Sequence, residues 1–301
     1  AVVIVVTSSS SDLKTDSYLN KLGVNPIRES LSGKITQLQK RDMVKNDSLQ
    51  AAGARLISSA KNEPGTFSII VKNENKDFEL FYNEKIPYFG ASLYKVPIAV
   101  AALKEIEKGT FTTDYKVKYL PVDFYGGSGI LQTKSYNTEF ELLYITDVLI
   151  THSDNVAQSM VKRTIGEEPI REAFSNVTIS ENEDFYNTNT ITPLEMITLF
   201  ENVASQKYLN TSTTKYLITQ ASSTQFDDRI SIHLLSSLKF AHKIGNWAAD
   251  GSWHDCGLVY TDINNMEDST IVCVMSKGTK YASFIKVCKE IAAFVNKLES
   301  E

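Results

Sequence analysis

Apolar residues recur at helical spacing near both ends of the chain, and strand-like segments lie just inside these ends. Residues 36–62 and 281–298 show the helical pattern, and Asn62-Glu63-Pro64-Gly65 ends the first helix. Residues 66–73 and 78–85 are rich in β-branched and aromatic residues, with a short polar run between them. This pattern predicts a β-hairpin directly after the first helix.

The middle of the chain is dominated by helical patterns. An apolar helix is predicted over residues 93–107, and the section from about 110 to 235 consists mostly of helices and loops. Three further strands are predicted over residues 238–245, 255–262 and 269–277, before the final helix.

This order of elements predicts an α+β fold. An isolated hairpin is barely stable, so strands from both ends of the chain must share one antiparallel sheet, with the terminal helices packed on it. We expect one two-lobed domain over residues 35–301. Its α/β lobe combines residues 35–109 with 236–301, and residues 110–235 form an all-helical lobe inserted between them.

Composition narrows the class of protein. The chain has 301 residues, of which 42% are hydrophobic, so it can bury a large core. The net charge is −5 and no run of lysine and arginine stands out, which argues against a nucleic-acid partner.

The first residues differ in composition from the rest. Six apolar residues, 1–6, precede a serine-rich run, and six residues are too few to span a bilayer. We expect residues 1–34 to be the remnant of a signal peptide or of a membrane anchor upstream of residue 1, followed by a linker. A short apolar start of a disordered leader is the alternative.

The three cysteines, Cys256, Cys273 and Cys288, lack the spacing of metal ligands. The odd number leaves at least one thiol unpaired within the chain, and we expect all three to be small buried side chains. No metal site and no cofactor is predicted. The histidines, among them His152, His242 and His254, also lack ligand spacing.

The strongest chemical candidate is the pair Ser92 and Lys95. Three residues apart on a helix, the two side chains share one face. Ser92 falls at the helix start, where free backbone N–H groups stabilise an oxyanion, and a buried lysine can lose its proton and act as a base. On its own, the pair also fits an ordinary helix cap beside a solvated lysine.

Three further motifs make coincidence less plausible. Ser153-Asp154-Asn155 precedes a helix, Lys243 lies two residues before Gly245 on a predicted strand, and residues 126–132 form a glycine-rich loop. Together with Ser92-x-x-Lys95, the order and spacing resemble the signature of penicillin-recognising serine enzymes, namely class A β-lactamases and D,D-peptidases. The resemblance extends over about residues 36–300.

The resemblance implies a fold and a set of roles. The family has a five-stranded antiparallel sheet with flanking helices and an all-helical lobe, with the site between them. Its implied substrates are β-lactams or D-alanyl peptides, and its implied location is the bacterial cell envelope, outside the cytoplasm. The implied roles are nucleophile for Ser92, activating base for Lys95, proton relay for Ser153, substrate amide binding for Asn155, and charge near the substrate carboxylate for Lys243. The backbone N–H groups of Ser92 and Asn246, beside Gly245, would form the oxyanion hole.

Two departures from the family pattern bear on activity. Ile244 replaces the usual Thr or Ser between Lys243 and Gly245, so a hydroxyl for the substrate carboxylate is missing, and Asn246 or Ser252 are the candidate substitutes. No Glu-x-x-Leu-Asn occurs from residue 155 to 193, where β-lactamases of this class position the deacylating water. The nearby acids Glu181, Glu183 and Asp184 fit a solvated turn.

We therefore expect a serine hydrolase that is acylated at Ser92 and deacylates slowly, like a D,D-peptidase or a weak β-lactamase. An efficient β-lactamase with a substitute base and a non-catalytic penicillin-sensing domain are the main alternatives. A glutaminase of the related fold is a weaker one.

Overall fold

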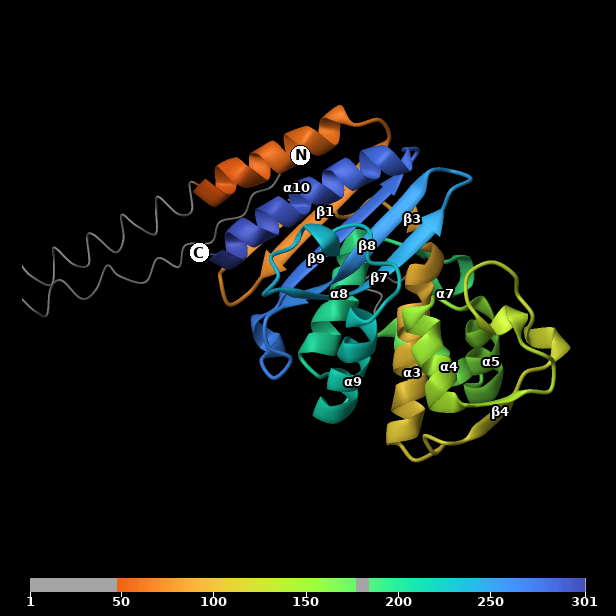
Figure 1. The fold of residues 1–301 in the computed structure, drawn as a ribbon. Helices are drawn as coiled ribbons and strands as arrows, with labels where there is room; N and C mark the ends of the chain where they lie inside the picture. The colour runs from red at the N-terminus through yellow and green to blue at the C-terminus, as the bar shows by residue number, and fades with distance from the viewer. Residues whose placement is uncertain (1–47, 177–183, 301) are drawn as a thin grey trace, which may run out of the picture.

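The computed structural model describes residues 48–176 and 184–300. Its centre is a five-stranded antiparallel sheet in the order β2-β1-β9-β8-β7 (Figure 1). The strands are β1 (Thr66–Asn73), β2 (Phe78–Tyr82), β7 (Lys239–Trp247), β8 (Ser252–Tyr260) and β9 (Thr270–Lys277). The pairing of β1 with β9 joins the two ends of the chain and confirms the predicted α+β fold.

The predicted hairpin is present as β1 and β2. Asn73 pairs with Phe78, and the Asn73 side chain accepts a hydrogen bond from the Lys76 backbone N–H at 3.0 Å, which closes the turn. Two short antiparallel pairs lie outside the main sheet. They are β3 (Tyr88–Phe89) with β6 (Thr190–Ile191), and β4 (Lys116–Lys118) with β5 (Glu139–Glu141).

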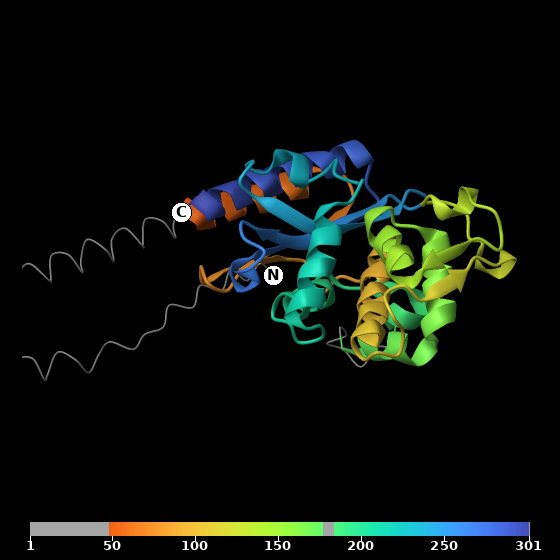
Figure 2. The same ribbon diagram turned by 60° about the horizontal axis from the view of Figure 1, so that its bottom comes forward.

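Two helices lie side by side on one face of the sheet, the helix over residues 48–62 and α10 (Tyr281–Ser300) (Figure 2). Their apolar faces and the sheet enclose a core that includes Leu56, Ile69 and Ile291. The predicted first helix is confirmed from residue 48 onward, and residues 36–47 lie outside the described residues. Burial of these amphipathic faces, rather than helix propensity, is what stabilises such helices.

The remaining helices lie on the other face of the sheet and in the lobe beside it (Figure 1). A second core, which includes Ile98, Leu149 and Met160, fills this region. The helices are α3 (Lys95–Glu107), α4 (Leu142–Thr151), α5 (Asn155–Ile165), α6 (Glu167–Ser175), α7 (Asp184–Thr188), α8 (Pro193–Ala204) and α9 (Thr211–Ser222). Single 3-10 turns cover Ala91–Tyr94, Pro121–Asp123, Leu131–Thr133, Ser231–His233 and Met266–Asp268.

All three cysteines are buried and one thiol is unpaired, as expected, but the sequence did not predict that the other two form a disulfide. Cys256 on β8 and Cys273 on β9 are direct cross-strand partners and form a disulfide, whereas Cys288 is a buried free thiol. Opposite residues in neighbouring antiparallel strands are close enough for such a bond, but their register is not visible in the sequence.

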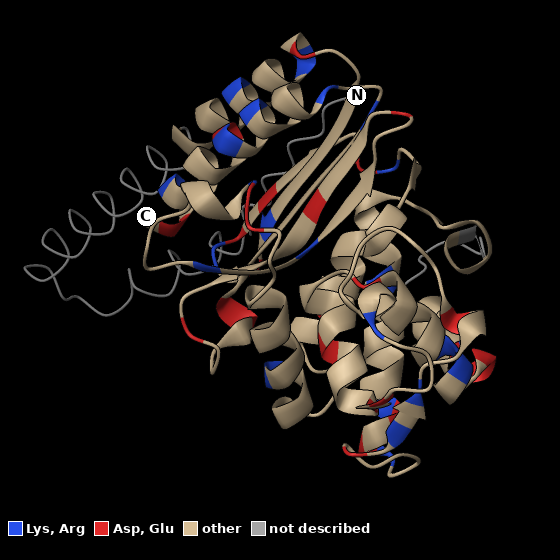
Figure 3. Cartoon of the chain, turned by 45° about the vertical axis from the view of Figure 1, so that its right-hand side comes forward, with Lys and Arg blue, Asp and Glu red and all other residues tan. Residues whose placement is uncertain are grey.

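Charged residues of both signs are interspersed over the two lobes (Figure 3). Among the described residues, no helix combines the length and the apolar character needed to cross a membrane. The predicted linker and leader, residues 1–34, lie outside the described residues, and the lobe boundaries stay a prediction.

Candidate active site

Ser92 lies in the 3-10 turn that leads into α3, and its side chain is half-buried. The residue before it, Ala91, has a left-handed φ of 47°, an uncommon conformation for a residue with a Cβ. Ser153 and Asn189 have left-handed φ angles as well, 50° and 55°. Strained backbone of this kind clusters at functional sites, where the surrounding structure compensates for its cost.

Lys95 is buried one turn after Ser92, with its amino group among four oxygen atoms. Its Nζ lies 2.6 Å from the Ser153 carbonyl oxygen, 2.7 Å from Asn155 Oδ1, 3.1 Å from Ser153 Oγ and 3.2 Å from Ser92 Oγ. The structure thus brings the first two motifs of the sequence together around one amine.

Burial lowers the pKa of Lys95 to about 7, and the negative charge of Asp154 offsets only part of this effect. A neutral amine has two N–H groups and one lone pair. The two shortest contacts go to the Ser153 carbonyl and to Asn155 Oδ1, which act only as acceptors, so they take both hydrogens. The lone pair is therefore left for a hydroxyl group, and Ser92 Oγ is in reach.

The Ser153-Asp154-Asn155 motif is held by its middle residue. The fully buried Asp154 carboxylate accepts backbone hydrogen bonds from Ile130, Leu131 and Ala157 at 2.6, 2.8 and 2.9 Å, which caps α5 and ties the glycine-rich loop to the motif.

The glycine-rich loop approaches Asp154 closely because it has glycine at position 129. At Gly129, with a φ of 117°, a Cβ would lie 2.3 Å from the Asp154 carboxyl carbon. Asn155 Nδ2 donates to the Gly126 carbonyl at 2.9 Å, which turns Asn155 Oδ1 toward Lys95. The loop is therefore part of the site rather than a plain turn.

Lys243 reaches the same serine from the sheet. Its Nζ donates to Ser153 Oγ at 2.9 Å, so Ser153 lies between two buried lysines. Burial, followed by the positive charges of Lys95 and Arg229, lowers the pKa of Lys243 well below its usual value.

Gly245 brings the strand against the turn that carries Ser92. A Cβ on Gly245 would lie 2.6 Å from the Gly90 carbonyl oxygen, so the two segments touch only because the residue is glycine. Asn246, the next residue, is exposed at the end of β7, and its Oδ1 accepts a 2.6 Å hydrogen bond from Arg229. Arg229 is fully buried and also donates to the His254 carbonyl at 2.6 Å.

The sequence did not identify Arg229 as a site residue, because it lies in a loop that shows neither a helical nor a strand-like pattern. The same holds for Asn189. Asn189 accepts a 2.7 Å hydrogen bond from the Gly90 N–H on its carbonyl and donates from Nδ2 to the Ala91 carbonyl at 2.9 Å. Phe185, four residues earlier, is buried and would approach a Cβ on Gly90 to 3.2 Å. This segment therefore packs directly on the turn that carries Ser92.

The buried histidines are structural. His254 donates from Nε2 to the Phe89 carbonyl at 2.9 Å and accepts on Nδ1 from the Ser276 N–H at 3.3 Å. Burial lowers the pKa of His254 to about 4, so the ring is neutral near neutral pH. His242 points to the opposite face of β7 from Lys243, as predicted, and lies 2.6 Å from Asp255.

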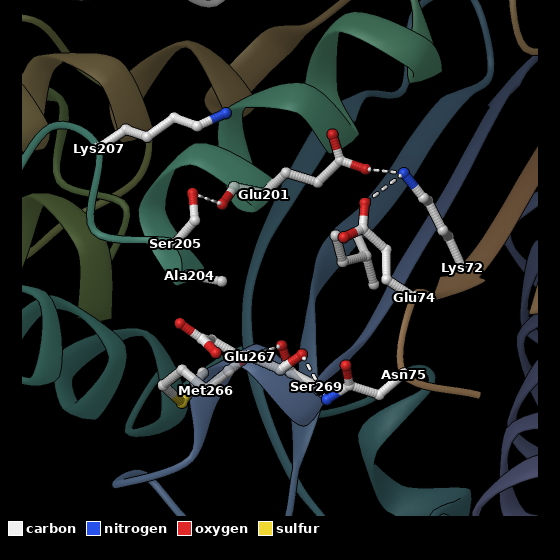
Figure 4. A pocket seen from close by; sticks show the side chains of 11 residues that line it. Lys72, Glu74, Asn75, Glu201, Ala204, Ser205, Lys207, Met266, Glu267 and Ser269 are labelled. Atoms are coloured by element: carbon white, nitrogen blue, oxygen red, sulfur yellow. Dashed lines mark hydrogen bonds and ion pairs between the residues drawn. The ribbon is translucent and has the colours of Figure 1, made fainter. Parts of the chain in front are cut away.

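A separate cavity of about 330 Å³ lies between the end of α8, the β1–β2 turn and the residues before β9 (Figure 4). Lys72 lies at one side of it, with Nζ 2.7 Å from Glu201 and 3.0 Å from Glu74. Because the charge of this lysine is paired with the carboxylates of Glu74 and Glu201, it does not offer a free positive charge for an anion. The residues that line the cavity are also different from those grouped around Ser92.

The fold and the grouping around Ser92 are those of a β-lactamase-like serine hydrolase. A model of the Beta-lactamase enzyme family matches residues 48–298, and the chain belongs to that family.

Solved structures agree with this assignment at the level of the fold. PBP-A has a TM-score of 0.72 at 20% identity, over 83% of this chain and 96% of PBP-A. A β-lactamase from Sphaerobacter thermophilus DSM 20745 has a TM-score of 0.71 at 15% identity, over 81% and 95%. The TLA-1 extended spectrum β-lactamase has a TM-score of 0.69 at 18% identity, over 82% of this chain and 99% of its own. No curated protein sequence matches the chain significantly.

Proposed function

We propose that the protein is acylated at Ser92 by β-lactams or D-alanyl peptides and releases the acyl group slowly, as a D,D-peptidase-like or penicillin-binding enzyme. The observation that carries the proposal is the buried Lys95 amine, 3.2 Å from Ser92 Oγ and with a pKa of about 7. It supplies a base beside the nucleophile at neutral pH.

The acylation step uses groups already in place. Ser92 Oγ attacks the carbonyl carbon of the substrate amide while its proton passes to Lys95 Nζ, and the oxyanion is stabilised by the backbone N–H groups of Ser92 and Asn246. The bond between carbon and nitrogen then breaks. Ser153 gives its proton to the leaving nitrogen and recovers one from Lys95 or Lys243, both within 3.1 Å of its Oγ.

Arg229 compensates for the hydroxyl that Ile244 removes. Lys243 and Arg229 bring a buried amine and a buried guanidinium under the strand, and Asn246 links Arg229 to the exposed surface. A substrate carboxylate on the side of the leaving nitrogen would lie beside Lys243, where it favours the protonated form of this lysine and meets the positive charge of Arg229 behind it.

Slow deacylation rests on the segment that packs against the nucleophile turn. Its described part, residues 184–191, presents the Phe185 ring and the Asn189 amide toward Gly90. Asn189 follows Phe185 by four residues, which is the spacing of Glu and Asn in a Glu-x-x-Leu-Asn pattern, so an aromatic residue stands where such a pattern has its acid. Neither an aromatic ring nor an amide is a base, so a water here stays a poor nucleophile. Glu181 and Glu183 lie outside the described residues, as does the side chain of Asp184.

A structural relative and the disulfide add support. A mutant of PBP-A, with a TM-score of 0.69 and 20% identity to this chain, has been solved as an acyl-enzyme complex with penicillin G. Disulfides persist in oxidising compartments, so the bond between Cys256 and Cys273 favours an extracytoplasmic location. A signal peptide or a membrane anchor, expected from the composition of residues 1–34, belongs to the same proposal.

Intact-mass spectrometry after mixing with benzylpenicillin tests the proposal. We expect one adduct of the mass of the drug, mapped to Ser92, absent in Ser92→Ala and retained in the control Ser205→Ala, at the distant cavity. The adduct should persist long after free drug is removed. Clearance within seconds would indicate an efficient β-lactamase, and the absence of any adduct would indicate a non-catalytic domain.

A further inference from the structure

Two aromatic side chains stand exposed beside the site, although neither belongs to a motif. Phe89 is 39% exposed and Trp247 is 50% exposed, and their rings meet edge to face with centroids 5.6 Å apart. Phe89 lies three residues before Ser92, and Trp247 directly follows Asn246. We infer that this pair, the aromatic shelf, binds a flat or bulky apolar group on the acyl side of the substrate, and this inference rests on the proposed acylation of Ser92.

The backbone that carries the shelf is held on both sides, although the two rings are exposed. The Phe89 carbonyl accepts from buried His254, and Phe89 pairs with Thr190 in the short β3–β6 sheet. Trp247 is paired with Ser252 at the end of β7. Aromatic side chains on a fixed backbone have few rotatable bonds, so they bind an apolar group with little loss of conformational freedom.

The direction of the substrate follows from the site. Ser153, which serves the leaving nitrogen, contacts Lys243, so the leaving group lies at the Lys243 end of the strand. Lys243, Gly245 and Trp247 alternate onto the same face of β7, and Trp247 lies about 13 Å farther along the strand.

The acyl part of the substrate extends from Ser92 away from the leaving group. It therefore extends toward the end of β7 that carries Trp247. The contact of Gly245 with Gly90 brings the strand against the nucleophile turn between these two ends.

Two penicillins that differ only on the acyl side test the inference. Benzylpenicillin carries a phenylacetyl group, and 6-aminopenicillanic acid carries none. We expect wild type to acylate faster with benzylpenicillin, and Trp247→Ala and Phe89→Ala each to reduce the ratio of the two acylation rates by about tenfold. The matched control is Tyr144→Ala, which truncates another exposed aromatic, stacked on Phe140 at 5.8 Å in the helical lobe.

Binding can be read without chemistry, because the chain has only two tryptophans. In Ser92→Ala with Trp253→Phe, emission from Trp247 should change with benzylpenicillin and not with 6-aminopenicillanic acid. An unchanged ratio in both shelf variants, or equal fluorescence responses to the two penicillins, would overturn the inference. Wild type that forms no adduct with either compound would overturn the proposed function instead, and the fluorescence measurement would still decide on the shelf.

Discussion

The rate of acylation should depend on pH through Lys95. Burial shifts the pKa of this amine from 10.5 to about 7, which corresponds to about 5 kcal/mol of lost stability for the protonated form relative to the neutral form. Only the neutral amine accepts the Ser92 proton. The acylation rate should therefore be half-maximal near pH 7, level off about two units above it, and fall about tenfold per unit below it.

A stopped-flow measurement with a fluorescent penicillin, from about pH 5 to about pH 9, gives this profile. At about pH 5 the neutral fraction is near one in a hundred, so acylation should be about 100-fold slower than on the plateau. Lys95→Ala should lower the plateau by at least about 10²-fold and remove the dependence on pH. Lys104→Ala, which replaces a partly exposed lysine on the same helix, is the matched control and should leave the profile unchanged.

A profile that is flat over this range, or whose midpoint lies above about pH 9, would contradict the assignment of Lys95 as the base. Near-normal acylation by Lys95→Ala would do so as well, and would transfer the role to Ser153 or Lys243.

Three further predictions concern stability. His254 has a pKa of about 4 in the folded chain and about 6.5 in the unfolded chain, so its contribution to the free energy of unfolding should be complete above about pH 6.5 and fall by about 3 kcal/mol as the pH drops to about 4. Chemical denaturation of His254→Gln should show a smaller fall over this range. An equal fall would argue against a buried neutral ring. Replacing both Cys256 and Cys273 by alanine should cost about 3 kcal/mol, and the unfolded, non-reduced wild type should show a single alkylatable thiol rather than three. Asp123→Ala should lower the free energy of unfolding by about 2 kcal/mol in urea denaturation, because it removes the paired hydrogen bonds that Arg163 donates to Asp123 at 2.7 and 2.8 Å. A loss near zero would mean that this pair does not order the turn Pro121–Asp123.

The sequence predicts elements and motifs well where the signal is local. The hairpin follows from two strand patterns and a turn, and Ser92 and Lys95 share a face because they are three residues apart. The motifs that meet at Ser153 were linked by resemblance, since nothing local relates Lys243 to Ser153, 90 residues away.

The missed features are all long-range contacts. The disulfide joins two predicted strands, but its formation depends on the register that pairs Cys256 with Cys273. Asn189 reaches Ala91 across 98 residues from a segment with no strong periodicity. Phe89 and Trp247 are ordinary aromatic residues in the sequence, and only the crossing of their segments makes them neighbours.

The lowered pKa values of the two lysines follow from the side chains buried around Ser153. Lys95, Lys243 and Arg229 are all buried there, and Asp154 is the acid that acts on Lys95. The guanidinium of Arg229 is the permanent positive charge of the group. Its charge and that of Lys95 both disfavour the protonated form of Lys243, while burial disfavours it in each lysine. Asp154 is the negative charge that favours protonated Lys95, yet its oxygens are already bonded to three backbone N–H groups.

Without substrate, the arrangement therefore favours the neutral form of both amines around Ser153, which is the form that accepts a proton from serine. A carboxylate arriving beside Lys243 would favour the protonated form of that lysine, and a protonated Lys243 is the donor that Ser153 needs when it gives its own proton to the leaving nitrogen. Binding of an anionic substrate and the proton relay are thus coupled through the same 2.9 Å contact between Lys243 Nζ and Ser153 Oγ.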